Sequence, residues 1–240
     1  MFAAPAQDDH LPLLDDELEH GPVLDVHGRV KTRWRGWIHT GMFPLALAAG
    51  IVLIVVANGP LAKASAAVFM ATSLLLFGIS AVYHRFDWKP TTLALFRRLD
   101  HSNIFLLIAG TYTPLALCAL PFPKSVVLLS IIWFGALLGI LSRIFWLKAP
   151  RWSYVALYIV LGWGAVLYIV DLVNFDVAAM VLILIGGLAY TTGAIFYGLK
   201  RPNPVPGVFG FHELFHSATV IAFACHWTAI LLIVLHPLAA

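Results

Sequence analysis

Residues 177–198 read VAAMVLILIGGLAYTTGAIFYG, and no side chain in this stretch is charged. A helix needs about 20 apolar residues to cross the roughly 30 Å hydrocarbon layer of a membrane, so this stretch is long enough to span one. Six further apolar stretches, each about 18–25 residues long, lie near residues 42–59, 63–84, 99–120, 125–146, 153–171 and 212–235. The sequence therefore predicts an all-α integral membrane protein, built as a seven-transmembrane helix bundle.

The composition of the whole chain excludes an ordinary soluble domain. Of its 240 residues, 61% are hydrophobic and 11% are charged, whereas a soluble domain has about 25% charged residues. Lipid admits helices or closed barrels, and the alternation of apolar and polar residues that barrel strands require is absent. Cys118 and Cys225 both lie inside apolar stretches, so we expect neither a disulfide framework nor a cysteine-based metal site.

Charge divides the chain into three parts. Seven of the twelve acidic residues fall between residues 8 and 25, and the first basic residue is Arg29. We expect a disordered acidic tail over 1–28, a basic amphipathic segment at the membrane interface over 29–41, and the seven-helix domain over 42–240. The net charge of +3 identifies no partner. We expect no nucleic-acid partner, and the sequence predicts no oligomeric state.

The basic residues also predict an orientation. Thirteen of the 15 Lys and Arg residues precede the first span or lie in the second, fourth and sixth loops, and the other two lie in the first and third loops. Because cytoplasmic loops carry the excess of Lys and Arg, this pattern indicates a cytoplasmic N-terminus and an extracytoplasmic C-terminus. We expect a multi-pass protein of the cell membrane, plasma or inner.

A histidine motif opens the last span. His212 to His216 read HELFH, which fits the HExxH pattern of zinc metalloproteases. Two histidines four residues apart share one helix face and can bind one metal ion. A catalytic zinc site uses three protein ligands and leaves one position open. Protease classes that take the third ligand from downstream are excluded, because Glu213 is the last acid and Thr219 and Ala222 replace the Gly and His of the extended motif.

The predicted topology supplies the third ligand from upstream. His84 ends the second span and Asp100 begins the third, at the same depth as the HELFH motif. Ser80 lies one turn before His84 on the same face, where it could hydrogen-bond a ligand, a water molecule or a substrate, or allow close helix packing. A carboxylate such as Asp100 is costly in a membrane unless it is paired. It is a candidate to hold and deprotonate a zinc-bound water, or else a helix N-terminal charge or an ion-pair partner of nearby arginines.

Other polar residues receive simpler interpretations. A pair of histidines hydrogen-bonded between helices is the alternative for His212 and His216. Glu213 suits the first turn of a helix, where the dipole favours an acid, although it could also face the metal. We expect His101 to have a structural role or to support a ligand rather than to bind the metal. His226 lies about 15 Å along the helix from His216, which excludes it from the same site, and it is interpreted as a packed or hydrogen-bonded intramembrane residue. His39 is expected at the interface, out of reach of the site.

Four short motifs together resemble the hemolysin III family of the progestin and adipoQ receptor group, which includes the adiponectin receptors. They are RGWIH before the first span, SAVYH at the end of the second, LDHSNIFLLIAGTYTP in the third and HELFH in the seventh. The resemblance implies a Zn²⁺ cofactor bound by His84, His212 and His216, with Asp100 holding the zinc-bound water and Ser80 assisting as the catalytic residues. The wider superfamily includes alkaline ceramidases, which implies zinc-dependent hydrolysis of a lipid amide or ester, with a membrane lipid as substrate.

Three functions stay open at this point. The chain could be a zinc-dependent hydrolase, a receptor-like or membrane-homeostasis protein with structural zinc, or a cytolysin or pore, as the family name suggests. A pore would need polar stripes on several helices, and none is found outside the cluster at the predicted cytoplasmic side. The first two differ in whether a water can reach the zinc and whether a lipid-sized cavity leads to it.

Overall fold

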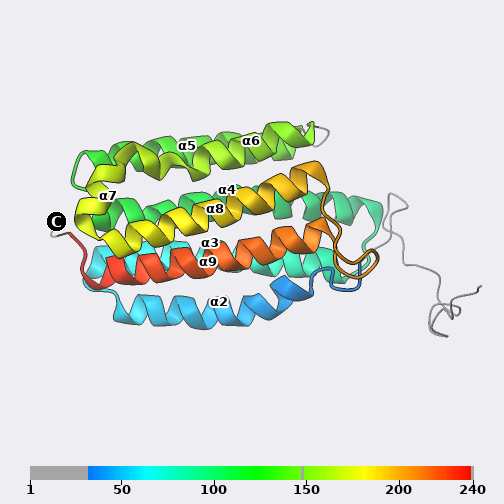
Figure 1. Ribbon diagram of the computed structural model, residues 1–240, viewed down its shortest axis with the longest axis horizontal. Coiled ribbons are helices and arrows are strands. Elements are labelled where there is room, and N and C mark those ends of the chain that lie inside the picture. Colours follow the sequence, from blue (N-terminus) through cyan, green and yellow to red (C-terminus); the bar gives the residue numbers. More distant parts are fainter. Residues whose placement is uncertain (1–31, 147–148, 239–240) are drawn as a thin grey trace, which may run out of the picture.

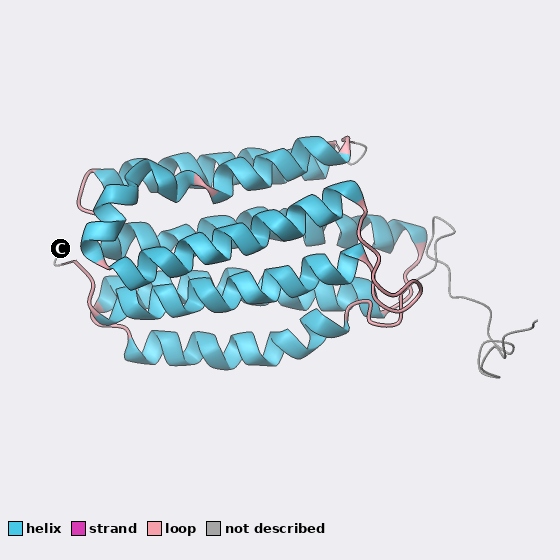
Figure 2. Ribbon diagram, viewed as in Figure 1, coloured by secondary structure: helices cyan, strands magenta, loops and turns pink. Residues whose placement is uncertain are grey.

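The computed structural model describes residues 32–146 and 149–238 (Figure 1). These residues form an all-helical bundle with seven helices long and apolar enough to cross a membrane, which confirms the predicted fold class. The elements are α2 (Trp37–Val56), α3 (Pro60–Arg85), α4 (Pro90–Ala119), α5 (Lys124–Phe145), α6 (Arg151–Gly162), η1 (Gly164–Tyr168), α7 (Ile169–Phe175), α8 (Val177–Leu199) and α9 (Phe211–Leu235). Figure 2 shows that loops join the long helices at the two ends of the bundle.

Two helices begin earlier than the apolar stretches indicate. Helix α2 begins at Trp37, five residues before the expected start at 42, and α4 begins at Pro90, nine residues before 99. Pro90 occupies the first turn of its helix, where proline is favoured because its missing N–H would be unpaired there anyway. The early start of α2 has a consequence for the site, since it places His39 inside the first membrane-spanning helix.

The fifth span is long enough to cross the membrane as a single helix, but its helical geometry changes part-way along. It consists of α6, the short 3₁₀-helix η1 and α7, and the change of geometry at Trp163 leaves backbone groups without their usual partners. The Tyr112 side chain of α4 supplies them: its hydroxyl donates to the Gly162 carbonyl at 2.7 Å and accepts from the Ala165 N–H at 2.7 Å. Since a membrane interior offers no water to pair such groups, this tyrosine stabilises the break.

Replacing Tyr112 with phenylalanine is therefore expected to destabilise the protein. The change removes one hydroxyl and leaves two buried backbone groups unpaired, at a cost of about 1–3 kcal/mol each. The thermal midpoint in detergent should fall by several degrees. Tyr168→Phe is the matched control, because the described residues offer the Tyr168 hydroxyl no hydrogen bond; its midpoint should stay near that of the wild type. An unchanged midpoint in Tyr112→Phe would contradict this role.

Helix α4 forms the centre of the bundle. It packs against α3, α5, α6 and α9, and its apolar window is the most buried of the seven. Figure 1 shows α5 and α6 along one side and α2 along the other, with α3, α4, α8 and α9 between them. The site described below lies where α3, α4, α8 and α9 come together.

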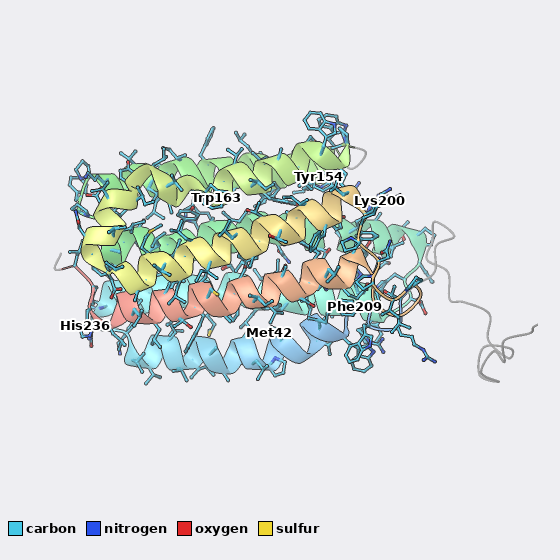
Figure 3. All side chains as sticks on the ribbon, in the orientation of Figure 1. Met42, Tyr154, Trp163, Lys200, Phe209 and His236 are labelled. Carbon is cyan, nitrogen blue, oxygen red and sulfur yellow. The ribbon has the colours of Figure 1, made fainter. Side chains whose placement is uncertain are left out.

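The described basic residues gather at one end of the bundle, here called the basic end. It contains the start of α2, α4, α6 and α9 and the finish of α3, α5 and α8. Its described Lys and Arg residues are Arg33, Arg35, Arg85, Lys89, Arg97, Arg98, Arg143, Arg151, Lys200 and Arg201, against Lys63 and Lys124 at the opposite end. Figure 3 places Lys200 and Phe209 at the basic end and His236 at the opposite end.

Candidate metal centre

Three histidines from two helices meet inside the basic end. His84 lies in the last turn of α3, and His212 and His216 lie in the first two turns of α9. The two helices run in opposite directions, so the finish of α3 lies beside the start of α9. His84 and His216 are buried, with 6% and 3% of their surface exposed. The structure thus brings together the three histidines that the sequence predicts as metal ligands.

The distances within this cluster suit a metal ion. One ring nitrogen from each of the three histidines lies within 4.8 Å of the other two. The Nε2 atoms of His84 and His212 are 3.1 Å apart, close to the separation of about 3.3 Å for two nitrogens that bind one tetrahedral zinc ion at about 2.0–2.1 Å. A hydrogen bond between these two rings would have the same length, but it would leave His216 unexplained. The cluster could hold a metal ion, and ligation itself stays a prediction.

Asp100 and Ser80 lie beside the histidines. An Asp100 carboxylate oxygen is 3.9 Å from Nε2 of His84. Ser80, which is buried, lies close enough to interact with the same carboxylate. Among the described residues, the basic side chain within 4.0 Å of the Asp100 carboxylate is His84, which disfavours the alternative of an ion pair with Arg97 or Arg98. The carboxylate therefore faces the histidine cluster.

Glu213, the acid of the HExxH pattern, takes part in a different set of contacts. Its carboxylate accepts a hydrogen bond from the Gly210 N–H at 2.8 Å and another from the Thr32 hydroxyl at 2.5 Å. Arg35 lies 3.8 Å away as its ion-pair partner. These contacts close the first turn of α9 and attach the segment before α2 to it, as the helix-start interpretation predicts. The resemblance to a metalloprotease motif therefore does not extend to the glutamate.

The Glu213→Gln variant distinguishes a role of Glu213 at the helix start from a role in the metal centre. It removes the charge that faces Arg35 and weakens the cap of α9, so stability should fall by about 1–2 kcal/mol. Metal content should stay at the wild-type level, because the side chain is committed to the helix start. Elemental mass spectrometry and a thermal melt of the same preparation would measure both. Loss of metal from an otherwise folded Glu213→Gln protein would show that the glutamate does serve the centre.

A fourth histidine, His39, lies against the cluster, and the sequence pattern predicts its position wrongly. The expectation that it stays out of reach fails, because its ring stacks on that of His216 with centroids 3.8 Å apart and planes at 9°. The Phe77 ring also packs against it, nearly perpendicular, with centroids 5.1 Å apart and planes at 84°. The physical reason is the early start of α2, which carries His39 into the bundle. Its ring fixes the orientation of His216 by packing.

A second polar group surrounds His101 of α4. The His101 ring contacts the Arg97 carbonyl through Nδ1 at 2.6 Å and the Tyr197 hydroxyl through Nε2 at 3.1 Å. The Tyr158 hydroxyl donates to the His101 carbonyl at 3.0 Å. Tyr197 in turn lies 5.9 Å from His212, measured between ring centroids. His101 thus has the structural role expected of it, and it connects the metal centre to α6 and α8.

A cavity of about 350 Å³ opens from the histidine cluster into the bundle. Its walls include the three clustered histidines, Asp100 and Ser80 at one end. They reach Trp163, Tyr190 and His226 further inside, and Tyr112 also lines the cavity. His226 bonds the Ile183 carbonyl through Nε2 at 3.2 Å, in agreement with its interpretation as a hydrogen-bonded intramembrane residue. Ligand cavities in proteins commonly measure about 300–1,000 Å³, so this one falls within the range of ligand-binding sites.

Comparison with known proteins places the chain in a family. The family model described as Haemolysin-III related matches residues 28–227. The chain belongs to the haemolysin III-related family. The matched residues of this haemolysin III-related protein include His39 and all three histidines of the cluster. The family expectation drawn from the four motifs is thereby confirmed.

Two bacterial proteins are similar to this haemolysin III-related chain over much of its length. It is 39% identical to Hemolysin-3 of Bacillus cereus over 131 residues, which cover 54% of this chain and 59% of that protein. It is 34% identical to the Hemolysin-3 homolog of Bacillus subtilis over 151 residues, 62% of this chain and 68% of that protein. A shorter match of 54 residues, 41% identical, links 20% of the chain to 17% of an ADIPOR-like receptor of Saccharomyces cerevisiae.

Proposed function

We propose that this protein is a zinc-dependent hydrolase of a lipid amide or ester in the cell membrane, with its basic end toward the cytoplasm. The observation that carries the proposal is the position of the histidine cluster: it lies at one end of a cavity within the size range of ligand-binding sites, with a carboxylate beside it. The excess of basic residues at the same end supports the orientation.

The donor set fits zinc. Three imidazole nitrogens, with both cysteines elsewhere in the chain, match the ligands of catalytic zinc sites, which use three protein side chains and keep a position open. His84, His212 and His216 would hold the ion. When bound, zinc supplies Lewis acidity, which lowers the pKa of water and polarises a carbonyl group. His39 would keep the His216 ring in the orientation that binding needs.

The remaining steps are assigned to residues of the chain. The Asp100 carboxylate accepts the proton of the attacking water and later returns it to the leaving amine or alcohol, as a general base and then a general acid. The Ser80 hydroxyl, which interacts with this carboxylate, would hold it by a hydrogen bond and fix its direction. The apolar part of the cavity binds the acyl chain and excludes bulk water, which leaves the scissile carbonyl near the cluster.

A hydrolysis assay tests the proposal. The purified full-length protein would be offered acyl amides, including ceramides, and acyl esters in detergent or vesicles, and fatty-acid release would be followed by mass spectrometry. We expect release that stops after treatment with a chelator and returns when zinc is added. A protein that carries zinc and binds lipid but releases no fatty acid would instead favour the receptor-like alternative.

The pore alternative has a different signature. The name of the Bacillus cereus relative, Hemolysin-3, suggests lysis, yet the described cavity is walled largely by apolar and aromatic side chains and its polar groups are concentrated at the basic end. Leakage of a dye from vesicles that contain the protein would support a pore. We expect no leakage at protein levels that give measurable hydrolysis.

A further inference from the structure

Arg143 is a buried cation to which the proposed mechanism assigns no role. Arg143 lies near the end of α5 and is 2% exposed, and its guanidinium lies 4.2 Å above the centre of the Tyr154 ring. Its Nε and Nη1 atoms have no hydrogen-bond partner among the described residues. An arginine close to a helix end can normally extend its side chain to water. Arg143 instead points inward and lines the cavity.

A second arginine lines the same cavity. Arg97 of α4 also lines the cavity, and its Nε is buried and unpaired among the described residues. Arg151 lines the cavity as well. Arg151 is already engaged, since it donates to the Tyr197 carbonyl at 3.1 Å and stacks on the Tyr197 ring.

The cavity wall is therefore positively charged on the side of α4 and α5. Four arginines line the described wall, and Arg35 among them is paired with Glu213. Asp100 is the one carboxylate among the described lining residues, and it faces His84 and Ser80. Buried guanidinium nitrogens without hydrogen-bond partners are costly in a low-dielectric interior, so a bound anion would stabilise this wall.

We propose that Arg143 and Arg97 form an anion-binding site at the basic end of the cavity, which takes the phosphate of a phospholipid whose acyl chain enters the apolar part. A phosphate group has enough oxygens and charge to accept hydrogen bonds from two guanidinium groups at once, whereas a carboxylate is matched by one. Tyr154, His101 and Tyr197 form a continuous ring contact from Arg143 to His212. A phosphate at Arg143 would hold the lipid headgroup on the same cavity wall that leads to the histidine cluster. This inference rests on the proposed function for the lipid's role as substrate, and it narrows that substrate to a phospholipid.

Binding measurements on the full-length protein in detergent test the site directly. The probes are dioleoyl phosphatidic acid, dioleoylglycerol with the same chains and no phosphate, oleate, and inorganic phosphate. Phosphatidic acid should bind about tenfold or more tightly than dioleoylglycerol, because hydrogen bonds to charged groups are lost without the phosphate. Oleate and inorganic phosphate should both compete poorly. Equal binding of dioleoylglycerol, of oleate or of free phosphate would overturn the proposal.

Variants assign the effect to the two arginines. In Arg143→Gln the advantage of phosphatidic acid should fall to about threefold or less, and in Arg143→Lys it should be intermediate, because the charge is kept and the bidentate geometry is lost. Arg97→Gln gives an independent reading if Arg143→Gln does not fold. Arg201→Gln, an exposed arginine at the same end, is the matched control and should bind like the wild type. Folded Arg143→Gln and Arg97→Gln proteins that both keep the full preference would overturn the site.

The metal content of the same samples separates this site from the proposed function. Arg143→Gln should keep the metal of the wild type, since the arginine is no part of the histidine cluster. If the wild type carries no metal and still prefers phosphatidic acid through Arg143, the hydrolase proposal fails and the anion site stands. If zinc and hydrolysis are present and the phosphate makes no difference, the anion site fails alone.

Discussion

Replacement of Asp100 by asparagine is expected to reduce lipid hydrolysis by about 100-fold or more while the metal stays bound. General acid and base groups contribute about 10²–10⁴-fold to enzymatic rates, and asparagine cannot take up the proton. The carboxylate lies 3.9 Å from His84 and is not needed for the three nitrogen ligands. Fatty-acid release and metal content would be measured on the same preparation.

Two controls sharpen the result for Asp100. Ser80→Ala should reduce the rate less, because it removes only the hydrogen bond that directs the carboxylate. The matched control is Asp171→Asn, because Asp171 lies at the opposite end of the bundle, where it pairs with Lys124 at 2.7 Å. This variant should hydrolyse lipid at the wild-type rate. Full activity in a folded Asp100→Asn protein would remove Asp100 from the chemistry.

Loss of any one clustered histidine is the second large effect that we expect. In His84→Ala and in His212→Ala, zinc affinity should fall by more than the 10–100-fold typical of changes around a metal site, because a ligand itself is removed. Competition with a zinc chelator would measure the affinity, and hydrolysis should disappear with the metal.

His226→Ala is the matched control for the histidine variants. It lies on the same helix as His212 and His216, lines the same cavity and bonds the Ile183 carbonyl. Its substitution should leave zinc affinity unchanged. If His226→Ala loses zinc as completely as His212→Ala, the effect reports a general loosening of the bundle and not ligation.

The fold could be predicted because a membrane-spanning helix must be apolar along most of its length, so the spans can be recognised from composition. Seven apolar stretches of spanning length leave few alternatives, and the alternation of basic and nonbasic loops assigns an end of the bundle to each helix terminus. That assignment places His84, Asp100 and His212 at one depth, so residues from three distant segments can be combined into one site by the sequence alone. The break in the fifth span is not visible in the sequence, because it depends on a hydroxyl from Tyr112 on another helix.

The parts of the site that the sequence does not predict depend on helix rotation and on exact helix starts. His39 looks like an interfacial residue because the apolar run begins after it, yet α2 begins at Trp37 and buries the ring. Arg143 counts as an ordinary basic residue at a helix end, and only the rotation of α5 about its axis shows that it points inward. Packing between helices sets such rotations, and a single sequence does not encode them in a readable pattern.

Elemental mass spectrometry of the detergent-purified wild-type protein measures whether the cluster of His84, His212 and His216 holds zinc. We predict about one zinc per chain, lost in each of the three histidine-to-alanine variants and kept in Asp100→Asn. A folded wild-type protein without stoichiometric metal, or a His84→Ala variant that keeps its zinc, would show that these three histidines are not a zinc site.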